Sequence, residues 1–245
     1  MMLRVALTAF LATAGFAQTT SQTFHFTYIQ APQARQEMVN VLRSVGQIRD
    51  IAADTSGAVT VNGTDEEIAL ANWLVQALDQ EPGTQTQSSR AFVTSDPRFP
   101  EVRVHYTSNS PTPQALQEIV NTVRSIAEVQ MISVFNAGFT VAMRGDSEGI
   151  ALAEWLVYGL DRPSKASAGM VDYGLPFGMN SEVVRLFYLP PSSSEARMQL
   201  MAKVRSEIQM QRFIACNNPR AFAARGTSDQ IADATRLILQ AKLEQ

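Results

Sequence analysis

The side chains that most often catalyse reactions or bind metal ions are scarce in this sequence of 245 residues. Its two histidines, His25 and His105, fall in similar places of two predicted strands, and its single cysteine, Cys216, lies in an apolar run. No group of His, Cys and carboxylate residues has the spacing of metal ligands. Nucleophile elbows, phosphate loops and dinucleotide fingerprints are absent from the sequence. We therefore predict no enzyme, no cofactor and no metal site, and we interpret Cys216 as a buried, unreactive thiol.

Two recurring features could bind ligands but have simpler structural explanations. Arg144-Gly145 and Arg225-Gly226 each precede a predicted helix, whose N-terminus attracts anions. We interpret the glycine as the residue that permits a tight turn and the arginine as solvated. Asp79 and Asp161 end two predicted helices, and we expect them to cap the chain that follows rather than to act in catalysis.

Six aromatic side chains are candidates for contacts with a partner. Trp73 and Trp155 lie at equivalent helix positions beside an apolar stripe, where each either packs against a sheet edge or anchors a partner. The other four belong to predicted first strands and could also bind a small ligand or a cell-wall glycan. They are Phe24, Tyr28, Tyr106 and Tyr188.

These residues belong to a sequence unit that occurs three times. The stretch Gly63–Asp79 recurs as Gly145–Asp161, and a weaker copy starts at Gly226, so that the spacing between copies is nearly constant. A fixed period with matching chemistry indicates one supersecondary unit used repeatedly. Hydrophobic periodicity gives each unit the order β-α-β-β-α.

The predicted fold class is α+β, with three tandem two-layer units in which a three-stranded sheet carries two helices on one face. We expect the opposite face of each sheet to be solvated or available to a partner. The first strand is predicted at residues 23–29, and residues 91–93 could add an edge strand. We expect units at residues 23–80, 102–162 and 182–245, with linkers at 81–101 and 163–181.

The N-terminus has the pattern of a cleavable secretory signal at residues 1–17. Arg4 precedes an apolar run, and Gly15-Phe16-Ala17 offers a small-x-small cleavage site before Gln18. No other apolar stretch approaches transmembrane length, so we expect a periplasmic or secreted protein without an integral membrane segment. The net charge is −3, and nucleic-acid binding therefore has no electrostatic support.

The hairpin and second helix of the first unit resemble the periplasmic N-domains of secretins, the outer-membrane channels of type II and type III secretion and type IV pilus systems. The resemblance rests on residues 51–64, Ile-Ala-Ala-Asp-Thr-Ser-Gly-Ala-Val-Thr-Val-Asn-Gly-Thr. It continues in the helix that ends in Leu78-Asp79. The second unit keeps Gly145 and Leu160-Asp161 but has Phe135-Asn136 at the place of the turn aspartate. The third keeps Gly226-Thr227 and lacks the Leu-Asp ending.

The resemblance implies ring stacking, protein–protein contacts and a periplasmic location. No membrane gate domain follows the third unit, so we expect a free-standing relative or an accessory rather than the channel. We therefore expect a non-enzymatic interaction or assembly module that binds an envelope protein or copies of itself. A periplasmic binding module for a small ligand or a cell-wall glycan is the alternative.

Overall fold

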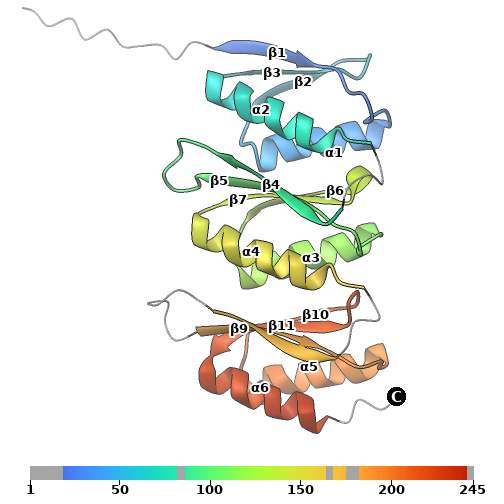
Figure 1. Cartoon of the computed structure of the whole chain (residues 1–245), viewed down its shortest axis with the longest axis vertical. Coiled ribbons are helices and arrows are strands. Elements are labelled where there is room, and N and C mark those ends of the chain that lie inside the picture. Colours follow the sequence, from blue (N-terminus) through green and yellow to red (C-terminus); the bar gives the residue numbers. More distant parts are fainter. Residues whose placement is uncertain (1–18, 82–85, 164–167, 175–181, 242–245) are drawn as a thin grey trace, which may run out of the picture.

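A computed structural model of the chain describes residues 19–81, 86–163, 168–174 and 182–241. These residues form six α-helices and three antiparallel sheets, arranged as three successive units along one axis (Figure 1). The predicted α+β fold of repeated units is therefore confirmed. The predicted signal peptide lies outside the described residues.

The first unit has the predicted β-α-β-β-α order. Its sheet has the strand order β1-β3-β2, with both neighbouring pairs antiparallel. Its elements are β1 (Thr20–Phe24), α1 (Pro32–Ser44), β2 (Asp50–Ala53), β3 (Val59–Gly63) and α2 (Asp65–Leu78).

The second and third units repeat this order but have one strand more than predicted. Strands β4 (Ser88–Val93) and β8 (Gly169–Tyr173) lie in segments predicted as linkers, and each pairs with the first strand of the unit that follows. The second sheet has the order β4-β5-β7-β6, and the third β10-β11-β9-β8. The second unit comprises β5 (Glu101–Tyr106), α3 (Pro113–Ile126), β6 (Met131–Phe135), β7 (Thr140–Gly145) and α4 (Ser147–Leu160). The third comprises β9 (Glu182–Tyr188), α5 (Ser194–Ile208), β10 (Arg212–Cys216), β11 (Ala221–Thr227) and α6 (Ser228–Gln240).

The helix starts follow the sequence signals. The Thr64 hydroxyl accepts a hydrogen bond from the Glu67 amide (3.3 Å), and the Glu67 carboxylate accepts one from the Thr64 amide (2.7 Å). Thr227 and Gln230 form the same capping box at α6. Such boxes satisfy amide groups that have no partner inside the helix, so each of these helices begins directly after its threonine.

The first strand lies earlier in the chain than predicted, because Asp79 organises the residues after it. The Asp79 carboxylate accepts hydrogen bonds from the amides of Thr27 (2.6 Å), Tyr28 (2.7 Å) and Ile29 (2.9 Å). These amides therefore do not pair in the sheet. Asp79 thus holds the loop that follows β1, not the chain that follows α2 as predicted.

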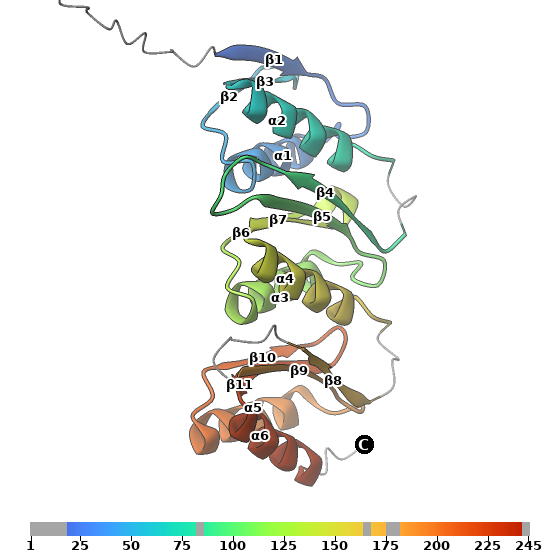
Figure 2. The ribbon, with the colours of Figure 1, turned by 60° about the vertical axis from the view of Figure 1, so that its left-hand side comes forward.

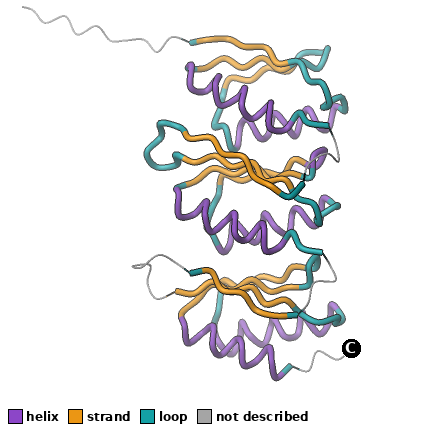
Figure 3. The backbone as a smooth tube through the Cα atoms, viewed as in Figure 1, coloured by secondary structure: helices purple, strands orange, loops and turns teal. Residues whose placement is uncertain are grey.

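The units stack so that the helices of one cover the sheet of the next (Figures 2 and 3). This corrects the expectation that one face of every sheet would be free, because the second and third sheets are buried on both faces. The helices of the first unit share one buried apolar cluster with Val102, Val104, Tyr106, Phe135 and Ala142 of the second sheet. The next junction buries Val184, Leu186, Tyr188, Cys216, Ala221 and Ala223 of the third sheet.

The face of the first sheet that is turned away from its helices differs in chemistry from these two. Side chains alternate between the faces of a strand, and here they are Ser21 and Thr23 of β1 with Thr60 and Asn62 of β3. The Thr23 and Thr60 hydroxyl oxygens lie 2.9 Å apart, and the Asn62 amide donates to Asp50 (3.1 Å). This face is therefore polar, unlike the faces covered at the junctions.

Candidate functional site

The two tryptophans lie at equivalent positions of the two junctions. Trp73 of α2 packs on Phe92 of β4 with ring centroids 5.5 Å apart, and Trp155 of α4 packs on Tyr173 of β8 at 5.3 Å. Both are half-buried. Each tryptophan thus contacts an edge strand of the next unit's sheet, which the sequence could not specify because β4 and β8 were not predicted in full.

Three of the four first-strand aromatic residues are buried. Phe24 faces the helices of its own unit, whereas Tyr106 and Tyr188 face the preceding unit. The Tyr106 hydroxyl donates to the carbonyl oxygen of Ala77 (2.7 Å), and that of Tyr188 donates to Gly159 (3.0 Å). Only Tyr28, in the loop after β1, is exposed, at 47%. The structure therefore does not bring these four side chains together on one surface.

A pair of polar contacts joins neighbouring units in the same way at both junctions. Glu37 of α1 accepts hydrogen bonds from the backbone amide (2.8 Å) and side-chain amide (2.9 Å) of Asn136. Glu118 of α3 accepts the same two bonds from Asn217, at 2.8 and 2.7 Å. The glutamate and the asparagine recur at the same spacing in the sequence. We call each glutamate–asparagine pair a latch, since it connects a helix to the hairpin of the next unit.

We expect Glu37→Gln to lower the free energy of unfolding by about 1–2 kcal/mol, because the neutral amide loses the charge-assisted acceptance of two hydrogen bonds. Urea unfolding followed by tryptophan fluorescence measures the effect. Glu195→Gln on the exposed first turn of α5 is the matched control and should change stability by less than about 0.5 kcal/mol. Equal effects of the two substitutions would show that the latch contributes nothing to the free energy of unfolding.

The arginines of the recurring Arg-Gly pairs are not solvated as predicted. Arg144 is buried, and it donates to the carbonyl oxygen of Phe99 (3.0 Å) and the hydroxyl of Thr94 (3.2 Å). Arg225 pairs with Glu182 (2.7 Å) and donates to the carbonyl oxygen of Ile126 at the end of α3 (2.8 Å). Both guanidinium groups therefore have protein partners that fix neighbouring segments.

A cavity of ≈ 410 Å³ opens between the second and third units. Leu152 and Tyr173 contribute apolar surface, whereas Arg144, Arg225 and Glu128 contribute charge. Its size falls within the range of small-molecule sites. Among the described residues, no group of three or more His, Cys, Asp and Glu side chains is placed to hold a metal ion.

His105 and Cys216 are both buried but have different surroundings. Neither ring nitrogen of His105 has a hydrogen-bond partner, and the ring packs edge-on against Tyr158 at 4.3 Å. Burial lowers the pKa of the His105 imidazole to about 4. The Cys216 sulfur lies 3.2 Å from the Thr122 hydroxyl, and burial raises its thiol pKa to about 12. The prediction of a buried cysteine is confirmed.

We expect the stability of the protein to fall on acidification through His105. Its folded-state pKa of about 4 lies below the ordinary value of 6.5, so the unfolded chain binds the proton first and the loss begins as the pH falls below 6.5. Between about pH 7.5 and pH 5 the loss is about 2 kcal/mol.

His105→Phe should remove this pH dependence, because Phe24 and Phe187 occupy the equivalent positions of the sister units. Urea unfolding of both proteins at the two pH values measures the difference. An equal acid loss in the variant would assign the effect to other groups.

Comparisons with known proteins give structural matches only. No family model and no curated protein matches the sequence. ExeD of Aeromonas hydrophila matches with 12% identity over 92% of this chain and 41% of that chain, at a TM-score of 0.21. The ETEC pilotin–secretin complex AspS–GspD matches with 12% identity over 94% of this chain and 39% of that chain, at a TM-score of 0.22.

Both of these solved structures are secretin-related. This chain spans about two fifths of the length of the chains it matches. None of the helices in the described residues has the length and apolar character needed to cross a membrane. Because the sequence identities and TM-scores of these matches are low, the function has to be argued from the chain's own residues.

Proposed function

We propose that this chain is a non-enzymatic module for protein–protein contacts outside the cytoplasm, as an accessory of a secretion or pilus apparatus. The observation that carries this proposal is that residues of the secretin-like motif maintain the fold of the units. Asp79 and Asp161 each hold the loop after the first strand of their unit, and Thr64 caps α2. Residues that maintain a fold identify the type of unit, and binding must then involve the surface of the stack.

The distribution of exposed apolar side chains supports this proposal. The unit cores and the junctions bury most large apolar residues, and the exposed ones lie on all three units, with Met170 and Leu239 lining one pocket of the third unit. Three examples are Tyr28, Met198 and Leu239, at 47%, 64% and 67% exposure. Single exposed apolar residues are normal, so the partner surface has to be located by experiment.

Site-specific photo-crosslinking in intact cells tests the proposal. A photoreactive amino acid is placed at Tyr28, Met198 or Leu239, and the cells are irradiated and fractionated. We expect at least one position to give a discrete adduct with another envelope protein or a second copy of the chain. The same amino acid at Phe213, which is fully buried, is the control. A free monomer at every position, in any fraction, would overturn the proposal.

The cavity between the second and third units favours a small-ligand binding module as the second candidate. Its ≈ 410 Å³ and its mixture of aromatic and charged side chains would suit a small polar ligand. Thermal-shift screening of small ligands and cell-wall fragments tests it. A ligand that raises the melting temperature of the wild type but not of Leu152→Trp, which fills the cavity, would support this candidate. No stabilisation by any compound would count against it.

A further inference from the structure

The free edge of β1 lacks a strand that its sister units have. In the second sheet β4 pairs along β5, and in the third sheet β8 pairs along β9. β5 and β9 are the equivalents of β1. They lie next to β7 and β11, as β1 lies next to β3. Among the described residues, β1 pairs only with β3. The hydrogen-bonding groups along its other edge are therefore available to an additional strand.

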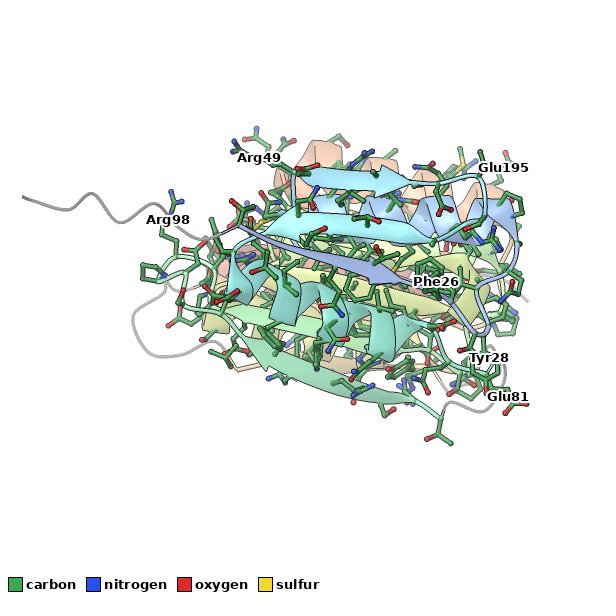
Figure 4. All side chains as sticks on the ribbon, turned by 90° about the horizontal axis from the view of Figure 1, so that it is seen from above. Phe26, Tyr28, Arg49, Glu81, Arg98 and Glu195 are labelled. Carbon is green, nitrogen blue, oxygen red and sulfur yellow. The ribbon has the colours of Figure 1, made fainter. Side chains whose placement is uncertain are left out.

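An open cavity of ≈ 540 Å³ lies at this edge, and we call it the β1 notch. Thr23 and Phe24 of β1 form one wall, Asn72 and Gln76 of α2 form the floor, and Arg90 of β4 closes it below. Figure 4 shows α2 beside β1, uncovered by the first sheet, with β4 of the second sheet beyond it. In the sister units the fourth strand covers this place.

The fourth strands of the sister units indicate which residues fit the notch. Their inward side chains are mixed: Ser89, Ala91 and Val93 in β4, and Met170 and Asp172 in β8. In each strand one of them makes a polar contact: Ser89 hydrogen-bonds Glu154 of α4, and Asp172 pairs with Arg185 (2.7 Å). Asn72 is the equivalent of Glu154, since each directly precedes the tryptophan of its repeat. A strand in the notch would therefore place one hydrogen-bonding side chain over Asn72.

We propose that β1 binds an extended segment of a partner protein, which adds as an antiparallel fourth strand and places a polar side chain over Asn72. Strand addition to an exposed sheet edge is a general mode of peptide recognition, in which main-chain hydrogen bonds supply affinity. β4 and β8 set its length at five to six residues. This inference rests on the proposed function, because it names the kind of partner and the surface that binds it.

The projecting strand β4 excludes a second copy of the chain as the occupant. Two β1 strands could pair antiparallel only with the copies side by side and parallel in axis. β5 is the equivalent of β1 in the second sheet, and β4 lies one strand further out. If two copies paired through β1, the β4 strand of each copy would occupy the space of the other copy's second sheet. A slender extended segment avoids this collision.

A phage-displayed library of linear ten-residue peptides is the probe. It is selected on the full chain, and the enriched peptides are measured for affinity and for NMR shifts of the β1 amides. Asn72→Trp fills the notch, and Asn40→Trp makes the same change on the exposed face of α1. We expect enriched peptides that shift the amides of residues 20–24. Their affinity should fall by about tenfold or more in Asn72→Trp and stay within about twofold in Asn40→Trp.

Three outcomes would overturn the inference. Peptides that bind both tryptophan variants equally well, or no enriched peptide on either the full chain or a chain starting at Gln18, would show that the notch is not a strand site. Enrichment on the chain starting at Gln18 but not on the full chain would assign the notch to the chain's own N-terminal residues. Each of these results leaves the proposed function standing if photo-crosslinking captures a partner elsewhere, whereas monomers at every crosslinking position would remove the proposed function itself.

Discussion

Asp161→Ala is expected to lower the free energy of unfolding by about 3–5 kcal/mol, since it leaves two part-buried amides and a buried hydroxyl without their acceptor. The Asp161 carboxylate is 1% exposed and accepts hydrogen bonds from the amides of Ser108 (2.7 Å) and Asn109 (2.7 Å) and from the Ser110 hydroxyl (2.9 Å). Asp161→Asn should lose less, because the amide keeps one acceptor oxygen.

Urea unfolding followed by tryptophan fluorescence measures this loss, because Trp155 lies in α4, the helix that ends directly before Asp161. Asp233→Ala is the matched control, since the Asp233 carboxylate is exposed and pairs with Arg236 on α6 (2.9 Å). Its effect should stay below about 0.5 kcal/mol. A similar small loss for Asp161→Ala would mean that water satisfies the loop amides and that the aspartate is not needed for the fold.

The double substitution Val102→Ser with Val104→Thr should detach the first unit from the second. It gives the second sheet the residues that Ser21 and Thr23 supply on the open face of the first. Both valines are fully buried against α1 and α2. Burying two hydroxyls there in place of apolar groups should cost about 3–6 kcal/mol. We expect the emission of Trp73 to shift to longer wavelength at lower urea concentration than that of Trp155.

The reverse change provides the control for this prediction. Thr23→Val puts an apolar side chain on a face that no helix covers, so its effect on stability should stay within about 0.5 kcal/mol. Single-tryptophan proteins, with either Trp73 or Trp155 replaced by Phe, separate the two signals. Simultaneous unfolding of both reporters in the double variant would show that the stack unfolds as one cooperative body.

The repeat units could be predicted because their signals are local. Periodic apolar positions, the capping residues Thr64 and Thr227, and the hairpin turns act within a few residues of each other. The recurrence of Glu37 as Glu118 was also visible in the sequence. Its partner Asn136 recurs as Asn217. The equal separation of glutamate and asparagine in the two cases would have indicated that they form a pair.

The edge strand considered at residues 91–93 is the second half of β4. The stacking, the first half of β4 and β8 could not be predicted, because they depend on residues far apart in the sequence. Ser88-Ser89-Arg90 has none of the β-branched or aromatic pattern of a strand, and it pairs because β5 offers an edge. One signal was available for the stacking in the third unit. Residues 183–188 have Val184, Leu186 and Tyr188 on one face of the strand and Val183 and Phe187 on the other, which is typical of a sheet covered on both sides.

The end faces of the stack determine how its length could change. Among the described residues, the middle unit has both a sheet face that accepts helices and a helix face that covers a sheet. At the position of Val41 and Thr122, both buried in junctions, α5 has the exposed Lys203, and Gln199 replaces the latch glutamate. Duplicating the middle unit within the chain should therefore give a longer rod with three matched junctions, whereas a copy of it appended after α6 would meet an unmatched surface. An engineer could use the middle unit as an interchangeable spacer that sets the distance between the two ends.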